Sequence, residues 1–174
     1  RPCLQILKTK PGTKLVSAFF IMVVPDCEMG ANGTFLFGDS GLEQNPDPEK
    51  LAAIALSSAD SFRLLTEKEP VVALLSHSTK GSAKHADVDK VVEATKIAKE
   101  NAPEGLLIDG EFQLDAAIVP SVGALTNVLH SMIILTLLCN GVLFQKVSAY
   151  RDIPKALMDM AVFGEESTLL IIII

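Results

Sequence analysis

The sequence predicts an α/β fold, arranged as three layers (αβα) around a mainly parallel sheet. Three observations lead to this prediction. Short apolar runs alternate with amphipathic stretches of helical length, an Asn-Gly pair separates two apolar runs near the start, and 49% of the 174 residues are hydrophobic. A chain of this length can bury a core, and 21% charged residues are typical of a globular domain.

The first two strands are predicted to form a hairpin. Leu15–Val24 is almost entirely apolar and rich in β-branched and aromatic residues, which predicts a buried strand. Thr34–Phe37 is a second apolar run, and Asn32 and Gly33 stand directly before it. Both residue types tolerate positive φ, so an Asn-Gly pair between apolar runs predicts a tight hairpin turn.

A helix is predicted to begin after Asp47, because Asp is a good N-cap, Pro48 suits the first helical position and Glu49 complements the helix dipole. Apolar and small residues at helical spacing then define one buried face. They are Leu51, Ile54, Ala55, Ser58 and Phe62. Pro70 ends this region of the chain.

The next region reads as strand, loop, helix and strand. Val71–Leu75 and Leu106–Ile108 are the strands, and Asp87 can cap the helix between them. The buried face of that helix is predicted to be Val88, Val91, Val92, Thr95 and Ala98. We expect both strands in one sheet, joined by a right-handed crossover. The Asp-Gly-Glu triplet at 109–111 is expected to close the second strand, and Asp115–Pro120 to form a short element of either type.

The character of the chain changes after Gly123. We therefore divide it into an α/β segment, residues 1–123, and an apolar tail, residues 124–174. Val128–Phe144 is marginal in length for a membrane span, and its polar and glycine interruptions favour a buried helix or a strand pair. The aliphatic run Leu169–Ile174 would promote aggregation if exposed, so we expect it to be buried, paired in a sheet or artefactual.

Charge and cysteine content narrow the possible functions. The net charge of −6 disfavours nucleic acid as the main partner. Cys3, Cys27 and Cys139 are far apart, and no Cys or His pair has ligand spacing, so neither a disulfide framework nor a metal site is predicted. Reduced thiols in the cytosol are the simplest interpretation. His77 and His85 are expected to be loop residues.

The turn Ser76–Ser82 is the strongest local candidate for a functional site. A strand that runs into a Ser/Thr/Gly turn before a helix places backbone amides where they can surround an anion. Ser78, Thr79 and Lys80 would add two hydroxyl groups and a cation. The spacing of a P-loop is absent, and the alternative of an ordinary connection between strand and helix stays open.

Other polar residues also have a structural alternative beside a chemical one. Arg1 suits bidentate phosphate binding, or is a solvated terminus. Cys27 is a free thiol or a small buried hydrophobe, with no His signature to make it a nucleophile. The carboxylates of Asp109, Glu111 and Asp115 could serve acid–base chemistry, but a strand-end turn and a helix cap are the interpretation we favour.

Five ordered blocks of the sequence resemble the phosphate acetyltransferase family. The blocks are Arg1-Pro2 with Lys8-Thr9; Ser17-Ala18-Phe19-Phe20 into Val24-Pro25-Asp26-Cys27-Glu28, then Gly33-Thr34-Phe35-Leu36-Phe37 and Asp39-Ser40-Gly41; Ile54-Ala55 with Ser57-Ser58-Ala59; Leu74-Leu75-Ser76 with Ser78-Thr79-Lys80-Gly81-Ser82; and Ile108-Asp109-Gly110-Glu111 with Gln113, Asp115-Ala116-Ala117 and Val119-Pro120. Together they cover about seven-tenths of the chain, far more than one short motif would.

The resemblance implies transfer of an acetyl group between coenzyme A and inorganic phosphate, with acetyl phosphate as the phosphorylated partner. It implies no metal or bound cofactor, since coenzyme A is a substrate. It also implies a fragment of a two-domain fold similar to isocitrate and isopropylmalate dehydrogenases, a homodimer in the intact family and a cytoplasmic location. A membrane is not an expected partner.

The same resemblance assigns substrate-binding residues. Arg1 falls at a substrate-binding arginine, and Cys27 at a cysteine near the coenzyme A site that is not regarded as the nucleophile. Lys80 and its neighbours fall on a loop that faces the cleft. The predicted substrate-binding set is Arg1, Cys27, Ser78, Thr79, Lys80, Gly81 and Ser82.

Parts of the family pattern are not found in this sequence. The chain begins Arg-Pro-Cys without Met, which predicts a fragment or a processed chain. After Gly123 there is no Asp-Leu-Ser-Arg-Gly motif with its following Asp, residues that in the family stabilise the oxyanion and supply the presumed base. The Ala-Pro-Gly-Ser stretch expected after Val122 is missing too.

We therefore expect little or no turnover by this chain. If turnover occurs, Arg151, Asp152 and Asp159 are the first residues to test. Two alternatives stay open: a non-catalytic α/β remnant that binds phosphate or coenzyme A or self-associates, and a membrane-associated fusion directed by the tail.

Overall fold

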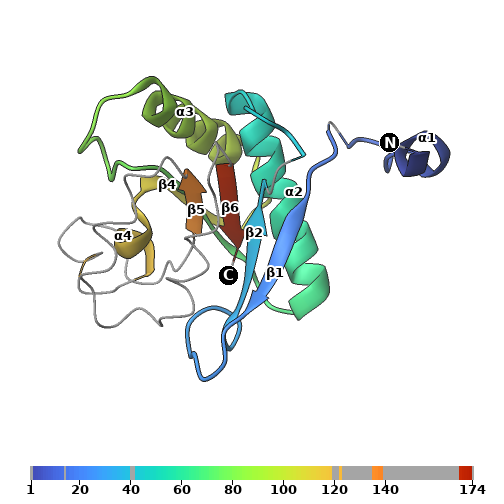
Figure 1. Cartoon of the computed structure of the whole chain (residues 1–174), viewed down its shortest axis with the longest axis horizontal. Helices are drawn as coiled ribbons and strands as arrows, with labels where there is room; N and C mark the ends of the chain where they lie inside the picture. The colour runs from blue at the N-terminus through green and yellow to red at the C-terminus, as the bar shows by residue number, and fades with distance from the viewer. Residues whose placement is uncertain are drawn as a thin grey trace.

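The structure is a computed structural model that describes residues 2–13, 15–39, 42–118, 122, 135–138 and 169–173. In chain order the elements are α1 (Pro2–Leu7), β1 (Phe19–Val23), β2 (Thr34–Gly38), α2 (Pro48–Thr66), β3 (Val71–Leu75), α3 (Ala86–Asn101), β4 (Leu107–Phe112), α4 (Leu114–Ile118), β5 (Leu135–Leu138) and β6 (Leu169–Ile173). Figure 1 shows a sheet beside two long helices, with α1 standing away from the body. The predicted α/β class is confirmed.

The strands form one sheet in the order β1-β2-β6-β3-β4, with β5 paired to β6. β3 and β4 lie parallel, as the strand–helix–strand pattern predicts. The prediction of a mainly parallel sheet is wrong, because β6 pairs antiparallel to β2, β3 and β5, and β1 pairs antiparallel to β2. β2 and β3 run in the same direction; a strand from the end of the chain lies between them and runs the opposite way.

The C-terminal aliphatic run is paired in the sheet, one of the outcomes left open by the sequence. Within the apolar run 128–144, residues Leu135–Leu138 form β5, and the rest of that run lies outside the described residues. No helix in the described part of the chain has the length and apolar character needed to cross a membrane. Both tail strands share a sheet with β2 and β3, and the division at residue 123 stays a prediction.

The predicted hairpin is confirmed. β1 and β2 pair antiparallel along their whole length. Asn32 and Gly33 have φ values of 53° and 80°, and the Thr34 N–H donates to the Ala31 carbonyl at 3.2 Å across them. The Asn-Gly turn therefore lies at the β2 end of a longer connection, and it needs the left-handed backbone that these two residue types accept.

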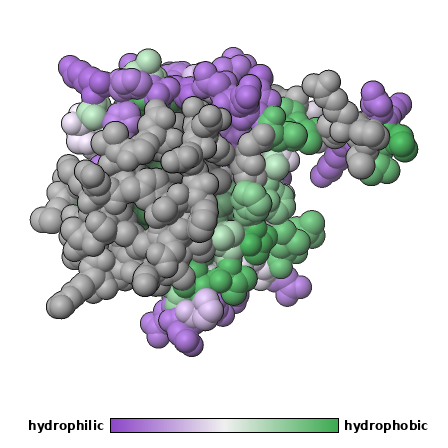
Figure 2. All heavy atoms as spheres, in the orientation of Figure 1, coloured by the Kyte–Doolittle hydropathy of each residue, from purple (hydrophilic) through white to green (hydrophobic). Residues whose placement is uncertain are grey.

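β1 is not the buried strand expected from its apolar run. It is the edge strand of the sheet, and Phe20 and Val23 are 57% and 66% exposed. Phe35 and Leu36 of β2 are fully buried instead. Figure 2 shows the apolar residues gathered on this side of the molecule. Apolar composition marks a strand, but it does not distinguish an edge strand from a central one.

α2 begins and ends where its capping residues dictate. The side chain of Asp47 accepts from the Lys50 N–H at 2.8 Å, and Pro48 occupies the first position. At the other end Glu67 has a φ of 58° and donates its N–H to the Arg63 carbonyl at 3.0 Å. The predicted inner face of this helix is buried at every position, so local capping and helical spacing are sufficient to define it.

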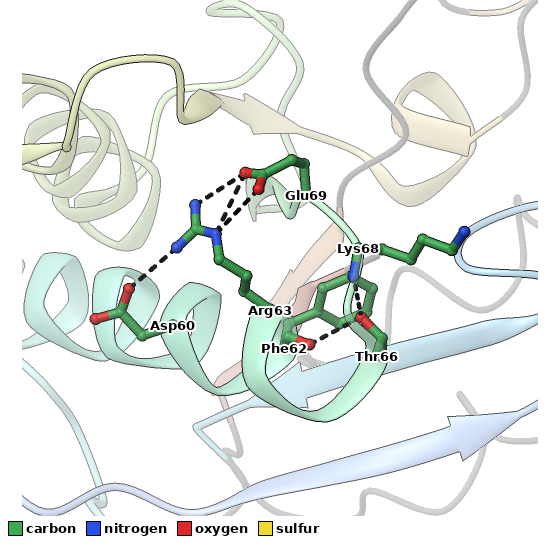
Figure 3. A network of polar contacts seen from close by, with 6 residues as sticks. All are labelled: Asp60, Phe62, Arg63, Thr66, Lys68 and Glu69. Carbon is green, nitrogen blue, oxygen red and sulfur yellow. Dashed lines mark hydrogen bonds and ion pairs between the residues drawn. The ribbon is translucent and has the colours of Figure 1, made fainter.

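Polar contacts fix the turn between α2 and β3 (Figure 3). Arg63 Nη2 lies 3.1 Å from Glu69 Oε2. The Thr66 hydroxyl donates to the Phe62 carbonyl at 2.8 Å and accepts from the Lys68 N–H at 3.3 Å. Exposed pairs of this kind contribute little stability one by one, but together they set the direction in which the chain leaves the helix.

α3 differs from the prediction in its cap and in one face position. His85, rather than Asp87, is the N-cap: its backbone is extended and its Nδ1 accepts from the Asp87 N–H at 3.2 Å. Asp87 then lies in the first turn, where its charge complements the helix dipole. Val92 is 45% exposed and Ala94 is buried in its place, because the row that contacts α2 and the sheet passes through Ala94.

β4 continues through the Asp-Gly-Glu triplet that was expected to close it. Gly110 permits this, since a Cβ there would lie 2.6 Å from Thr95 Oγ1 and 2.8 Å from the Leu74 carbonyl oxygen. The pairing with β3 shifts register between Leu74 and Leu75. The element of open type that follows is the short helix α4.

α2 and α3 pack against each other and so cover the same face of the sheet (Figure 1). Between them and the strands lies a continuous apolar core that includes Phe62, Leu74 and Phe112. Within the described ranges the long helices form one layer on one face, and the three-layer arrangement stays a prediction.

Gly33→Ala should destabilise the chain by more than about 2 kcal/mol, because the added Cβ overlaps the Val24 carbonyl oxygen and φ is +80°. Gly105→Ala is the matched control: φ is +86° but no atom lies within 4 Å of the new Cβ. Its free energy of unfolding should fall by only about 1 kcal/mol, the cost of placing a side chain at a left-handed backbone position. Denaturant unfolding measures both losses, and equal losses would show that the contact with Val24 is unimportant.

Candidate functional site

The carboxyl ends of β2, β3 and β4 lie at one end of the sheet, because these three strands run in the same direction. We call this end the carboxyl edge, to distinguish it from the lateral edge formed by β1. Asp39 follows β2, Ser76 follows β3 and Gln113 follows β4. The segments entering α2 and α3 meet at the same edge, where Lys90 Nζ donates to Asn45 Oδ1 at 2.8 Å. Open α/β sheets bind ligands at this edge, so the site is sought here.

The inner half of the predicted loop is buried and bound to β4. The Ser76 N–H donates to the Phe112 carbonyl at 2.8 Å, and the Gln113 N–H donates to Thr79 Oγ1 at 2.8 Å. Within the loop, the Ser78 N–H donates to Ser76 Oγ at 2.8 Å. All three hydroxyl residues are buried, so their polar groups hold the ends of β3 and β4 together.

One backbone amide and one hydroxyl of the loop bind a carboxylate that belongs to the chain itself. Oε1 of Glu111, a residue only 3% exposed, accepts from the Gly81 N–H at 2.7 Å and from the Ser78 hydroxyl at 2.9 Å. The Lys80 N–H donates to the Glu111 carbonyl at 3.2 Å. Lys80 and Gly81 have φ values of 46° and 82°, and this turn directs both of their amides to Glu111, one to its backbone and one to its side chain.

Two further loop amides are paired locally. The Thr79 N–H donates to Ser82 Oγ at 2.9 Å, and the Ser82 N–H donates to the Thr79 carbonyl at 3.1 Å. The sequence therefore identified a loop with the geometry of an anion cradle. That this loop binds substrate phosphate stays a prediction.

The Lys80 side chain turns back to the sheet. Its Nζ donates to Asp109 Oδ1 and to the Gly110 carbonyl, both at 2.8 Å, and lies 4.7 Å from the centroid of the Phe112 ring. Lys99 Nζ approaches the same Asp109 oxygen at 2.6 Å. Burial alone would raise the pKa of Asp109, but hydrogen bonds from Lys80 and Lys99 outweigh it and lower that pKa.

The three carboxylates considered for acid–base chemistry have separate partners. Asp109 faces two lysines, Glu111 faces the loop, and Asp115 accepts the N–H of Ala116 at 2.9 Å. Each therefore has a partner within the chain, but Asp109 and Glu111 lie inside β4 rather than in the strand-end turn that the sequence analysis favoured, and Asp115 lies in the first turn of α4. Elsewhere among the described residues, no group of three His, Cys, Asp or Glu side chains is placed to hold a metal ion.

The other two predicted binding residues are not seen at this edge. Arg1 lies outside the described residues. Cys27 is a half-buried free thiol in the connection from β1 to β2. That connection enters β2 at its amino end, and β2 is five residues long. At about 3.3 Å per residue, Cys27 and Ser78 are separated by roughly 15 Å or more.

Sequence reasoning gave no role to Asp39, although the structure makes it the most unusual carboxylate of this edge. It is 1% exposed, has a φ of 60°, and neither side-chain oxygen has a partner among the described residues. Burial, and then the charge of Glu43, raise its pKa to about 7 against the opposing effect of Lys90. In the sequence, Asp39 stands directly after an apolar run and within the Asp39-Ser40-Gly41 part of a block that resembles the family, but neither feature indicates burial.

A separate groove of about 540 Å³ lies between the segment 10–17 and the outer face of α2. Its polar lining includes Lys10, Ser57 and Asn101. None of the predicted binding residues that the structure describes lines it. The candidate site at the carboxyl edge is therefore separate from this groove.

Comparison with known proteins identifies the family of this chain. Residues 1–128 match the model of a family described as phosphate acetyl/butaryl transferase. A phosphate acetyltransferase from Acetivibrio thermocellus is 60% identical over 122 residues, which are 70% of this chain and 36% of that protein. The chain thus spans little more than a third of this relative's length.

Two solved structures show the same similarity. The EutD phosphotransacetylase from Staphylococcus aureus is 46% identical with a TM-score of 0.65, covering 74% of this chain and 38% of its own. A phosphotransacetylase from Streptococcus pyogenes is 38% identical with a TM-score of 0.66, covering 75% and 38%. The chain belongs to the phosphate acetyl/butaryl transferase family, as the resemblance in its sequence indicates.

Asp39→Asn should change how stability depends on pH. The pKa of Asp39 is about 7 in the folded chain against 3.8 in an unfolded one, so the wild-type chain should lose stability as pH rises from about 4 to 7. The neutral amide does not ionise, and the variant should be the more stable by up to about 4 kcal/mol at pH 8, at 1.36 kcal/mol per pKa unit.

Denaturant unfolding of both chains between pH 4 and pH 8 measures this difference. Ser58→Ala is the control, because Ser58 is likewise buried with no side-chain partner among the described residues but has no group that ionises in this pH range, so it should leave the slope with pH unchanged. Parallel curves for wild type and Asp39→Asn would show that Asp39 ionises normally in the folded chain.

Proposed function

We propose that this chain is part of an acyltransferase that moves an acetyl group between coenzyme A and inorganic phosphate. The observation that carries the proposal is the family match over residues 1–128, with 60% identity to a phosphate acetyltransferase. In the reaction the coenzyme A thiolate attacks the carbonyl carbon of acetyl phosphate, a C–S bond forms, the C–O bond to phosphate breaks, and inorganic phosphate leaves.

The rest of the proposed biology follows from the family. The intact form has two α/β domains resembling isocitrate and isopropylmalate dehydrogenases, assembles as a homodimer and works in the cytoplasm. It uses no metal or bound cofactor, since coenzyme A enters as a substrate. These features are proposed for a whole protein, because the matched segment is only 36% of the relative's length.

Within this chain we assign phosphate recognition to the predicted loop. The exposed half offers the Lys80 ammonium group, which is 41% exposed, and the hydroxyl of Ser82. Ser78 and Thr79 are buried and position the exposed half together with Gly81. Arg1 is proposed to bind phosphate. Cys27, which lies in the connection that enters the amino end of β2, is proposed to lie near coenzyme A.

The chain by itself should bind without catalysing acetyl transfer. The reaction places negative charge on the carbonyl oxygen, and stabilising that charge is usually the largest catalytic term. The Ser-Arg motif that supplies this stabilisation in the family is not found in the sequence after Gly123. Lys80 is already paired with Asp109, so it is poorly placed to replace that motif.

Purified chain should therefore form acetyl-CoA from acetyl phosphate and coenzyme A only at background rate. A chimera tests the segment itself: residues 1–122 of this chain replace the matching segment of the Acetivibrio thermocellus enzyme. The chimera should turn over at a rate within about tenfold of the parent, around 10 s⁻¹ for an ordinary enzyme. A chimera carrying Lys80→Met measures the contribution of the loop.

Two results would contradict the proposal. A folded but inactive chimera would mean that the segment no longer supports acetyl transfer. Rapid turnover by the chain alone would mean that its tail supplies the missing charge stabilisation, and Arg151, Asp152 and Asp159 would be mutated first.

The alternative function is self-association without catalysis, and β1 is the observation that favours it. β1 is an edge strand of sequence Phe-Phe-Ile-Met-Val, without a charged residue or proline. Natural edge strands usually carry such residues to prevent pairing between molecules. An antiparallel pair of β1 strands from two copies would extend the sheet and cover Phe20 and Val23.

Phe20→Lys should reduce concentration-dependent association in sedimentation velocity, because a charge on the exposed edge opposes pairing. Leu64→Lys is the matched control: Leu64 is also exposed, at 81%, but lies on α2. Identical weakening by both variants would indicate non-specific association rather than pairing through β1.

A further inference from the structure

The anion in the predicted loop is a side chain of the protein. Oε1 of Glu111 receives two donors, the Gly81 N–H at 2.7 Å and the Ser78 hydroxyl at 2.9 Å. We call these two donors the carboxylate nest. The Ala83 N–H donates to Ser78 Oγ at 3.1 Å, which leaves the hydroxyl proton of Ser78 free to point at the carboxylate.

The nest has the chemistry of a small oxyanion site. A backbone amide and a hydroxyl converge on one oxygen, and both are donors that suit a carboxylate or phosphate oxygen equally well. Gly81 is exposed to solvent, whereas Ser78 is fully buried. An external anion could therefore approach from the Gly81 side, but Glu111 already fills the position.

The backbone holds the nest open independently of the Glu111 side chain. The Lys80 N–H donates to the backbone carbonyl of residue 111, and the Gln113 N–H donates to Thr79 Oγ1. Neither bond involves the carboxylate. Removing the side chain therefore leaves two ties between the loop and β4, and the donors should keep their places.

We infer that Glu111 is a positioning residue that controls whether small oxyanions can enter the carboxylate nest. With Glu111 in place these two donors are occupied and a negative charge keeps other oxyanions from them, so phosphate bound by the wild-type loop contacts only its exposed half, Lys80 and Ser82. Without Glu111 the nest accepts a phosphate or carboxylate oxygen from solution. The inference rests on the proposed function in one respect only: it concerns the loop to which we assign phosphate recognition.

The test compares phosphate binding by the full chain in four forms: wild type, Glu111→Gln, Glu111→Ala, and Glu111→Ala combined with Ser78→Ala. The probes are inorganic phosphate and formate, at constant ionic strength with chloride as the balancing anion. The Gly81 amide resonance in ¹⁵N–¹H NMR spectra reports binding at the nest itself, which a general change in stability would not mimic. No coenzyme A and no turnover are required.

The expected order of affinity is wild type below Glu111→Gln below Glu111→Ala. Glutamine keeps the shape but removes the repelling charge, and alanine also vacates the space. Hydrogen bonds to a charged group contribute about 1.5–3 kcal/mol, so phosphate should bind Glu111→Ala about ten- to a hundredfold more tightly than wild type. The double variant should lose most of this gain, because Ser78 supplies one of the two donors.

Asp109→Asn is the charge-matched control. It removes one negative charge two residues away without emptying the nest, and should leave the Gly81 amide unresponsive to phosphate. If Glu111→Ala does not fold, Glu111→Gln decides the question, since its affinity must still exceed that of wild type. The inference is overturned if the Gly81 amide responds equally in wild type and Glu111→Gln, or if the double variant binds as tightly as Glu111→Ala. Failure here would leave the chimera result unaffected.

Discussion

The contacts between β4 and the loop after β3, made by the backbone and by the Glu111 carboxylate together, are the interactions on which this edge of the molecule depends. β3 and β4 are parallel neighbours. Beyond their carboxyl ends the backbone groups no longer pair between the strands and need other hydrogen-bond partners. One carboxylate oxygen satisfies the Gly81 amide and the Ser78 hydroxyl together. The loop can then take a tight, polar course while its inner residues stay buried.

The same edge shows how environment separates otherwise similar carboxylates. Asp109 is neutralised by two lysines, and Glu111 is hydrogen-bonded by the loop. Asp39 is buried, and among the described residues it has neither an ion pair nor a hydrogen bond to its side chain. Burial therefore raises the pKa of its carboxyl group. Position on the sheet, rather than residue type, therefore separates the raised pKa of Asp39 from the lowered pKa of Asp109.

The family relationship explains why the site looks incomplete. The chain matches its family over residues 1–128 but corresponds to little more than a third of a full-length relative. The exposed half of the loop contributes one cation, Lys80, and one hydroxyl, Ser82, whereas charge stabilisation in acyl transfer usually requires several converging groups.

The sequence by itself determined the local elements. Capping residues and helical spacing defined α2, and Asn32-Gly33 defined the hairpin turn, because caps and positive φ values depend on neighbours within a few residues. The five family blocks likewise identified the family, and hydroxyl and glycine content identified the loop.

Tertiary structure alone decided the pairings between distant segments. β1 became an edge strand and β6 entered between β2 and β3, because strand order depends on which segments pair across the whole chain. The partner of the Gly81 amide is thirty residues away, and the isolation of Asp39 depends on what packs around it. Burial and long-range hydrogen bonding leave no periodic signal in a sequence. The sequence therefore predicted a loop suited to phosphate, but only the structure shows that the Glu111 carboxylate occupies two of its donors.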